Sequence, residues 1–215
     1  MKIPVYIPFA LSNTELLCLV SAASVLRKKE HLKSFIKYAV SAGISRRKLY
    51  ESLLQTYLFS GFPSALISLK ILSDILSEQV KPFRKNDNRN FYVIGERTCK
   101  KIYGAKFSKL ISNIQAYSPE LSEWLVTEGY GKVLSRPGLS LVERELEIIS
   151  VLSALKFEDQ LYSHINGAVR LKTSPGKISR VISNLELIKP GLSSFGNKVF
   201  RKYLNKKGIE MDSHP

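Results

Sequence analysis

Apolar residues recur at intervals of three and four along the first part of the chain, which is the spacing of helices that bury one face. This pattern predicts four helices there. They are a helix over residues 14–28, a second carrying residues 32–40, a third that follows Ser45 and stops at Gly61, and a fourth that begins at Pro63. The first is apolar on nearly all sides, so we expect it to be buried.

Residues at the predicted helix ends support these boundaries. Ser12 and Glu15 form a capping-box pattern ahead of the first helix, because each side chain can bond the other's backbone amide. Gly43 follows the second helix, where a glycine accepts the left-handed conformation that ends many helices. Pro63 suits the first turn of a helix, since its missing N–H is not needed there.

The middle of the chain is less regular. Residues 80–90 are polar and cationic, which is typical of a connector. Helices are expected again at about residues 96–103, 107–116 and 119–128. Regular structure is then expected to break at four residues that disfavour helices: Gly129, Gly131, Pro137 and Gly138. Strand-like alternation is nowhere sustained, so the predicted fold class is all-α.

An internal repeat predicts how the helices are arranged. Residues 14–45 align without a gap on residues 143–174, at an offset of 143 − 14 = 129. The identical pairs include Leu17/Leu146, Ser21/Ser150, Leu26/Leu155, Leu32/Leu161, Ser34/Ser163, Ile36/Ile165, Ala39/Ala168, Val40/Val169 and Ser45/Ser174. We therefore predict a bundle of two repeated helical hairpins around a shared core. The predicted organisation is a first repeat in residues 1–79, a connector with short helices in 80–129, a second repeat bearing the site in 130–190, and a basic tail in 191–215.

The chain is strongly basic. It has 33 Lys and Arg against 18 Asp and Glu among 215 residues, a formal net charge of +15. Such a charge suggests three classes of partner: nucleic acid, anionic membranes and carboxylate-bearing ligands. Because the cations are spread along the sequence, we favour a solvated basic surface. Binding of nucleic acid through residues 46–48, 81–89 and 198–207 stays an alternative from a different class, although no recognised nucleic-acid motif accompanies these segments.

The apolar runs and the cysteines indicate the cellular compartment of the protein. No apolar run approaches the roughly 18 residues that a spanning helix needs, and residues 16–26 are the best candidate. The N-terminal MKIPVYIPFAL is followed at once by polar residues, so it is a poor signal peptide. Cys18 and Cys99 are isolated, and Cys18 resembles a small buried hydrophobe. We expect a cytoplasmic protein without a membrane partner, in which a Cys18–Cys99 disulfide is the less favoured alternative.

Glu145 and His164 are the candidate chemical groups, since they lie within an apolar helical pattern in the second repeat. Measured from the turn near Phe157, Glu145 would lie about 18 Å and His164 about 10 Å down the hairpin. Direct contact is compatible with that geometry but does not follow from it. A carboxylate near an imidazole fixes its tautomer and suits a general acid or base. The alternative is a buried histidine with a purely structural neighbour.

The motifs around these residues resemble the carboxymuconolactone decarboxylase family. In the second repeat they are YGKVLSRPGL at residues 130–139, Glu143-Arg-Glu145-Leu, and Gln160-Leu-x-x-His164-x-x-Gly167-Ala168. In the first repeat the motif is Glu51-x-x-x-Gln55-x-x-x-Phe59-x-Gly61-Phe62-Pro63-x-Ala65. The resemblance implies an all-α bundle that assembles into homo-trimers or homo-hexamers.

Two branches of that family differ in chemistry. One decarboxylates a carboxylated muconolactone, and the other is the alkyl hydroperoxide reductase D type of thiol peroxidase, which uses a glutamate, a CxxC pair and a histidine. By resemblance, Glu145 and His164 match the acid and the histidine, whereas Phe157 and Gln160 stand where the cysteines would be. Without a thiolate there is no nucleophile, so thiol peroxidase activity is not expected. An alternative is that the chain descends from the peroxidase branch and would carry a peroxiredoxin activity only as a label given to the whole family.

The first repeat lacks both candidate groups. At the matching positions, Phe35 replaces His164 and Leu16 replaces Glu145. The Gly61-Phe62-Pro63 element in turn has no counterpart after the second repeat. We therefore predict one site per chain, composite between the repeats.

The favoured hypothesis is acid/base chemistry, decarboxylation or a related reaction, on a small carboxylated molecule. His164 would transfer the proton, Glu145 would orient it, and Arg136 or Arg144 would hold a substrate carboxylate unless they pair with nearby glutamates. Other candidate substrate-binding residues are Gln160, Phe157, Gly61, Phe62 and Pro63. No cofactor or metal is expected, since His31, His164 and His214 lack companions at ligand spacing. The alternative within the family is a non-catalytic member with a degenerate site.

Overall fold

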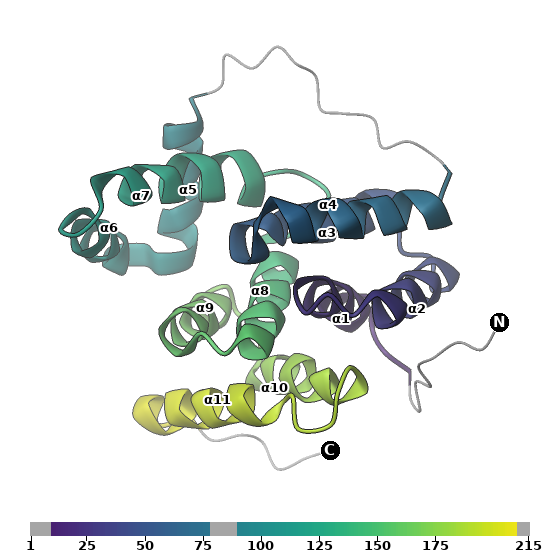
Figure 1. The fold of residues 1–215 in the computed structure, drawn as a ribbon. Helices are drawn as coiled ribbons and strands as arrows, with labels where there is room; N and C mark the ends of the chain where they lie inside the picture. Colours follow the sequence, from purple (N-terminus) through teal and green to yellow (C-terminus); the bar gives the residue numbers. More distant parts are fainter. Residues whose placement is uncertain (1–9, 78–89, 210–215) are drawn as a thin grey trace.

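The computed structural model describes residues 10–77 and 90–209, and these residues form helices without any strand (Figure 1). The all-α prediction is therefore confirmed. Several predicted features lie outside the described residues. They are most of the N-terminal MKIPVYIPFAL segment, nearly all of the connector at 80–90, the basic segment 81–89, and His214.

The first part of the chain folds into four helices much as predicted. They are α1 (Asn13–Val25), α2 (Lys29–Ser41), α3 (Arg46–Gln55) and α4 (Tyr57–Ile75). The capping box of Ser12 and Glu15 forms ahead of α1, and Gly43 follows α2 with a φ of 79°. The third helix ends earlier than predicted, because the Thr56 hydroxyl bonds the carbonyl of Leu53 and closes α3. Gly61, at φ 75° and ψ 169°, instead breaks α4.

The last part of the chain forms a second helical group around a long buried helix. Its elements are α8 (Leu141–Leu155), α9 (Glu158–Arg170), α10 (Pro175–Ser183), η3 (Asn184–Leu187) and α11 (Ser194–Lys207). Helix α8 packs against α9 and α10 on one side and against α1 on the other (Figure 1). Both α1 and α8 are buried along most of their length, so their contact is the centre of the protein.

The middle of the chain is more helical than predicted. It contains α5 (Phe91–Tyr103), η1 (Gly104–Lys106), α6 (Phe107–Gln115), α7 (Pro119–Trp124) and the π-helix η2 (Leu125–Leu134). Gly129 and Gly131 lie inside η2, so the prediction that they break regular structure is wrong. A Cβ on Gly131 would lie 2.2 Å from the carbonyl oxygen of Phe91, and one on Gly95 would lie 1.9 Å from that of Val126. At Gly95 and Gly131 the missing side chains therefore let the backbones of α5 and η2 touch.

By overall length and composition alone, helix α4 is the one helix of the described residues that could cross a membrane. The search for apolar runs in the sequence did not single it out. Its best window has a mean hydropathy of 1.3 and is 28% buried. The break at Gly61 leaves residues 63–75 as the continuous part, about 20 Å long at 1.5 Å per residue. A bilayer core is about 30 Å thick, so this part is too short to span it.

Candidate acid/base site

Glu145 and His164 are in direct contact in the core. Helices α8 and α9 bring Nδ1 of His164 to 3.0 Å from Oε2 of Glu145, so no bridging water is needed. Both side chains are buried, with exposed fractions of 1% for Glu145 and 8% for His164. In the neutral tautomer that donates Nδ1–H to the carboxylate, Nε2 carries the lone pair. Nε2 has no hydrogen-bond partner among the described residues and is the ring atom left for a ligand.

Gly167 allows this contact. A Cβ on Gly167 would lie 2.7 Å from Cγ2 of Ile102 and 2.8 Å from Oε2 of Glu145. The carboxylate therefore lies against α9 in space that any other residue would fill. This gives a physical reason for the glycine three residues after His164.

A pair of hydrogen-bonded tyrosines lies near the imidazole, and one of them contacts its ring. The hydroxyl oxygens of Tyr103 and Tyr130 lie 2.5 Å apart, and the Tyr103 ring meets the His164 ring edge-on at 6.4 Å between centroids. Burial, and then the Glu145 charge, raise the pKa of Tyr103, and burial raises that of Tyr130 well above its usual value. Burial and the same carboxylate raise the pKa of Cys99 to about 12. Tyr103, Tyr130 and Cys99 therefore stay protonated near neutral pH.

His164 opens onto an apolar cavity of about 380 Å³. Small-molecule sites commonly have volumes of about 300–1,000 Å³. The wall combines Leu58 and Phe59 of α4 with residues of α6, the α6–α7 turn, α7 and η2: Ile114, Tyr117, Leu121, Trp124, Leu125, Glu128, Gly129, Tyr130 and Leu134. Residues from both predicted repeats and from the connector thus share one cavity. No lysine or arginine of the described residues lines it.

Arg136 and Arg144 lie outside this cavity. Arg136 donates two hydrogen bonds to the buried Glu51 carboxylate, at 2.9 and 3.0 Å. Arg144 is 1% exposed and donates to Gln55, to Glu51 and to the carbonyl oxygen of Arg136. Pairing with a nearby glutamate, the alternative for both arginines, is therefore the arrangement found. The Glu51 and Gln55 motif serves this internal network.

The other candidate substrate-binding residues also lie away from the cavity. Gly61 forms the break in α4, and the 67%-exposed Phe62 stacks on Tyr57 beside Pro63. Phe157 and Gln160 are exposed at the start of α9. These five residues therefore do not line the cavity. The sequence pattern could not have shown where the cavity lies, because helix packing creates it.

Sequence reasoning missed a second buried carboxylate, Glu147. It accepts hydrogen bonds from Ser21, Ser52 and Gln55 at 2.7, 3.0 and 2.8 Å. Burial raises the pKa of Glu147 to about 7, against the lowering effect of Ser21, Ser52 and Arg144. The internal repeat could have indicated that Glu147 is buried, because at the offset of 129 it aligns with Cys18, which is buried.

Within the described part of the chain, no group of three or more His, Cys, Asp or Glu side chains is placed to hold a metal ion. Comparison with protein-family models and with curated proteins finds no match to this chain. The family resemblance therefore rests on the sequence motifs alone.

Proposed function

We propose that this chain is a carboxymuconolactone decarboxylase-like protein in which His164 and Glu145 transfer a proton to or from a small molecule in the apolar cavity. The observation that carries the proposal is the 3.0 Å contact between Nδ1 and the carboxylate, with Nε2 free beside a ligand-sized cavity. A carboxylate that orients the far nitrogen of an imidazole is a common acid/base arrangement.

For a decarboxylation, the chemistry balances with these two groups. The electron pair of the breaking C–C bond stays on the substrate carbon, carbon dioxide leaves, and Nε2–H of a protonated His164 supplies the proton. Glu145 stabilises the imidazolium and keeps the ring in place. The substrate itself must delocalise the electron pair, for example into a conjugated carbonyl group.

The cavity wall restricts the substrate. Because no described lysine or arginine lines it, protonated His164 is the group that would pair with a carboxylate. Glu128 lies at the wall and accepts a 2.5 Å hydrogen bond from Tyr57, adding negative charge. We therefore propose a small, mainly apolar substrate with a single carboxylate placed at His164.

Local geometry supports the two-repeat architecture within this proposal. At the offset of 129, the left-handed residues Arg27 and Gly43 match Lys156 and Lys172. The central contact is reciprocal too, since Ser21 donates to Glu147 and Ser150 donates to the carbonyl of Cys18, and Cys18 matches Glu147. Such reciprocity is expected of two copies packed about a shared axis.

The outer face of α4 supports the proposed homo-oligomer, a trimer or hexamer by resemblance. Phe62, Leu66 and Ile67 are exposed there, and large exposed apolar side chains that cluster commonly mark an interface. We expect light scattering to report an oligomer for the natural chain and a smaller species for Leu66→Glu. Cys18 and Cys99, both buried free thiols, suit the proposed cytoplasmic location.

Diethyl pyrocarbonate labelling tests the site directly. This reagent acylates free imidazole nitrogen, so Nε2 of His164 should react and be mapped on its peptide, with half-buried His31 as the internal reference. A γ-lactone with a carboxylate should slow labelling of His164 and not of His31, and carbon dioxide release should vanish in His164→Gln. If no lactone protects His164, and none raises the melting temperature, the chain is a non-catalytic member and the proposal fails.

A further inference from the structure

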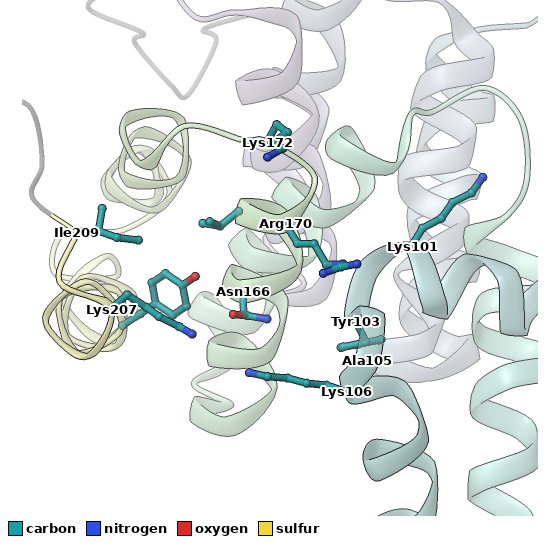
Figure 2. Close-up of a pocket in the computed structure, with 11 residues that line it drawn as sticks. Lys101, Tyr103, Ala105, Lys106, Asn166, Arg170, Lys172, Lys207 and Ile209 are labelled. Atoms are coloured by element: carbon teal, nitrogen blue, oxygen red, sulfur yellow. The ribbon is translucent and has the colours of Figure 1, made fainter.

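A second hollow lies on the other side of Tyr103 from the candidate site. It has a volume of about 760 Å³ and lies between the α5–η1 segment, α9 and α11 (Figure 2). Tyr103 lines this hollow, whereas its hydrogen-bond partner Tyr130 lines the apolar cavity. We call this second hollow the cationic cleft.

The cationic cleft is lined by five cations and by no carboxylate among the described residues. The cations are Lys101, Lys106, Arg170, Lys172 and Lys207. None of them has an ion-pair partner in the described part of the chain, whereas Lys33, Lys70, Lys100, Lys132 and Lys202 each have one. Five unpaired like charges around one hollow create a positive potential that favours an anion.

The five side chains do not all point the same way, and Lys101 extends away from the cleft (Figure 2). Figure 2 shows Lys106 of η1 and Lys207 of α11 reaching toward each other across the cleft, with Asn166 of α9 between them and Arg170 nearby. The asparagine amide adds an uncharged donor and acceptor to this set.

Gly104 leaves the space that the guanidinium of Arg170 occupies. This glycine has a φ of 57°, and a Cβ built on it would lie 2.3 Å from Cζ of Arg170. The guanidinium therefore packs directly on the backbone of η1 without a carboxylate to hold it there. No carboxylate of the described residues engages this guanidinium, so its N–H fork is available to a ligand.

We propose that the cationic cleft binds a small ligand that carries two or more phosphate groups. Arginine recognises phosphate oxygens in a bidentate manner, and lysines add point charges around it. Lys106 of η1, Arg170 of α9 and Lys207 of α11 surround one hollow from three elements, which suits a compact polyanion. A nucleic-acid strand is instead tracked by charges arranged along a groove. The volume also falls in the usual range of about 300–1,000 Å³ for small-molecule sites. This binding site is independent of the chemistry proposed for His164.

Calorimetry with tripolyphosphate tests the proposal on the full chain at about physiological salt. We expect saturable one-to-one binding that is at least tenfold tighter than that of orthophosphate. The variant Lys106→Gln/Arg170→Gln should weaken it at least tenfold, while the charge-matched Lys33→Gln/Lys70→Gln, which alters exposed pairs elsewhere, should not. Lys106→Gln/Lys207→Gln gives the same test if replacing Arg170 disturbs folding.

Three results would overturn the proposal that the cationic cleft binds a ligand with two or more phosphate groups. They are no binding at that salt concentration, an equal loss in the cleft and control variants, and tighter cleft-dependent binding of a 20-nucleotide single strand than of tripolyphosphate. The last would mark the surface as one that tracks nucleic acid.

Discussion

The carboxylate of Glu145 lies against Gly167, so that a methyl group on this glycine would come within 2.8 Å of Oε2. The same oxygen is 3.0 Å from Nδ1 of His164, one turn earlier on α9. One helix therefore supplies both the hydrogen-bond partner of the carboxylate and the space that it occupies.

Replacing Gly167 with alanine should separate this pair. The added methyl group must displace the carboxylate or Ile102, and we expect a loss of about 1–3 kcal/mol in the free energy of unfolding. The rate at which diethyl pyrocarbonate labels His164 should also change, because the Glu145 carboxylate that orients the ring moves. Gly176→Ala is the control, since a Cβ there meets no atom within 4 Å. Equal stability of the two variants, with unchanged labelling, would contradict the proposed packing.

Glu147 predicts a pH-dependent stability. Its pKa of about 7 in the folded protein exceeds the ordinary 4.5, so the folded state holds the proton more tightly than the unfolded state. Its contribution is complete below about pH 4.5 and is lost as the pH rises through 7. The loss is on the order of 3 kcal/mol. Urea unfolding of Glu147→Gln should show a shallower decline from pH 5 to 8 than the natural chain, and parallel curves would argue against the shift. Exposed Glu30→Gln serves as the control, because its pKa is lowered.

Glu51 and the two arginines that it binds should stabilise the folded protein and should not bind substrate. Glu51→Gln leaves Arg136 and Arg144 without their carboxylate, and breaking such a buried network costs about 3–5 kcal/mol. Asp74→Asn removes an exposed pair with Lys70 and should cost less than about 1 kcal/mol. Thermal unfolding of both variants measures the difference. An Arg136→Ala variant that lost lactone binding at full stability would restore the substrate-binding role.

Two neighbouring glycines of η2 should respond differently to alanine. Gly131→Ala forces a methyl group into the backbone of α5, whereas a Cβ on Gly129 meets nothing within 4 Å. We expect Gly131→Ala to lower the melting temperature by several degrees and Gly129→Ala to leave it unchanged or slightly raised. Similar melting temperatures for both would show that α5 and η2 are not in backbone contact in solution.

The helical class and most helix ends were predictable from the chain, because they depend on local physics. Apolar spacing places α1 and α2 within a few residues, and the capping residues Ser12 and Glu15 form the bonds that their pattern predicts. Local rules failed in the middle of the chain. A glycine in a sequence is ambiguous between breaking a helix and permitting close contact, and only the position of α5 decides the matter for Gly131.

The sequence by itself determined the all-α class and the main helices, and it singled out Glu145 and His164 as candidates. Tertiary structure decided which side chains these two meet. It placed His164 at an apolar cavity, took Arg136 and Arg144 to Glu51, and gathered five cations from separate elements into a cleft. The physical reason is that helix formation depends on neighbours along the chain, whereas a site depends on distances between residues tens of positions apart, which the packing of helices sets.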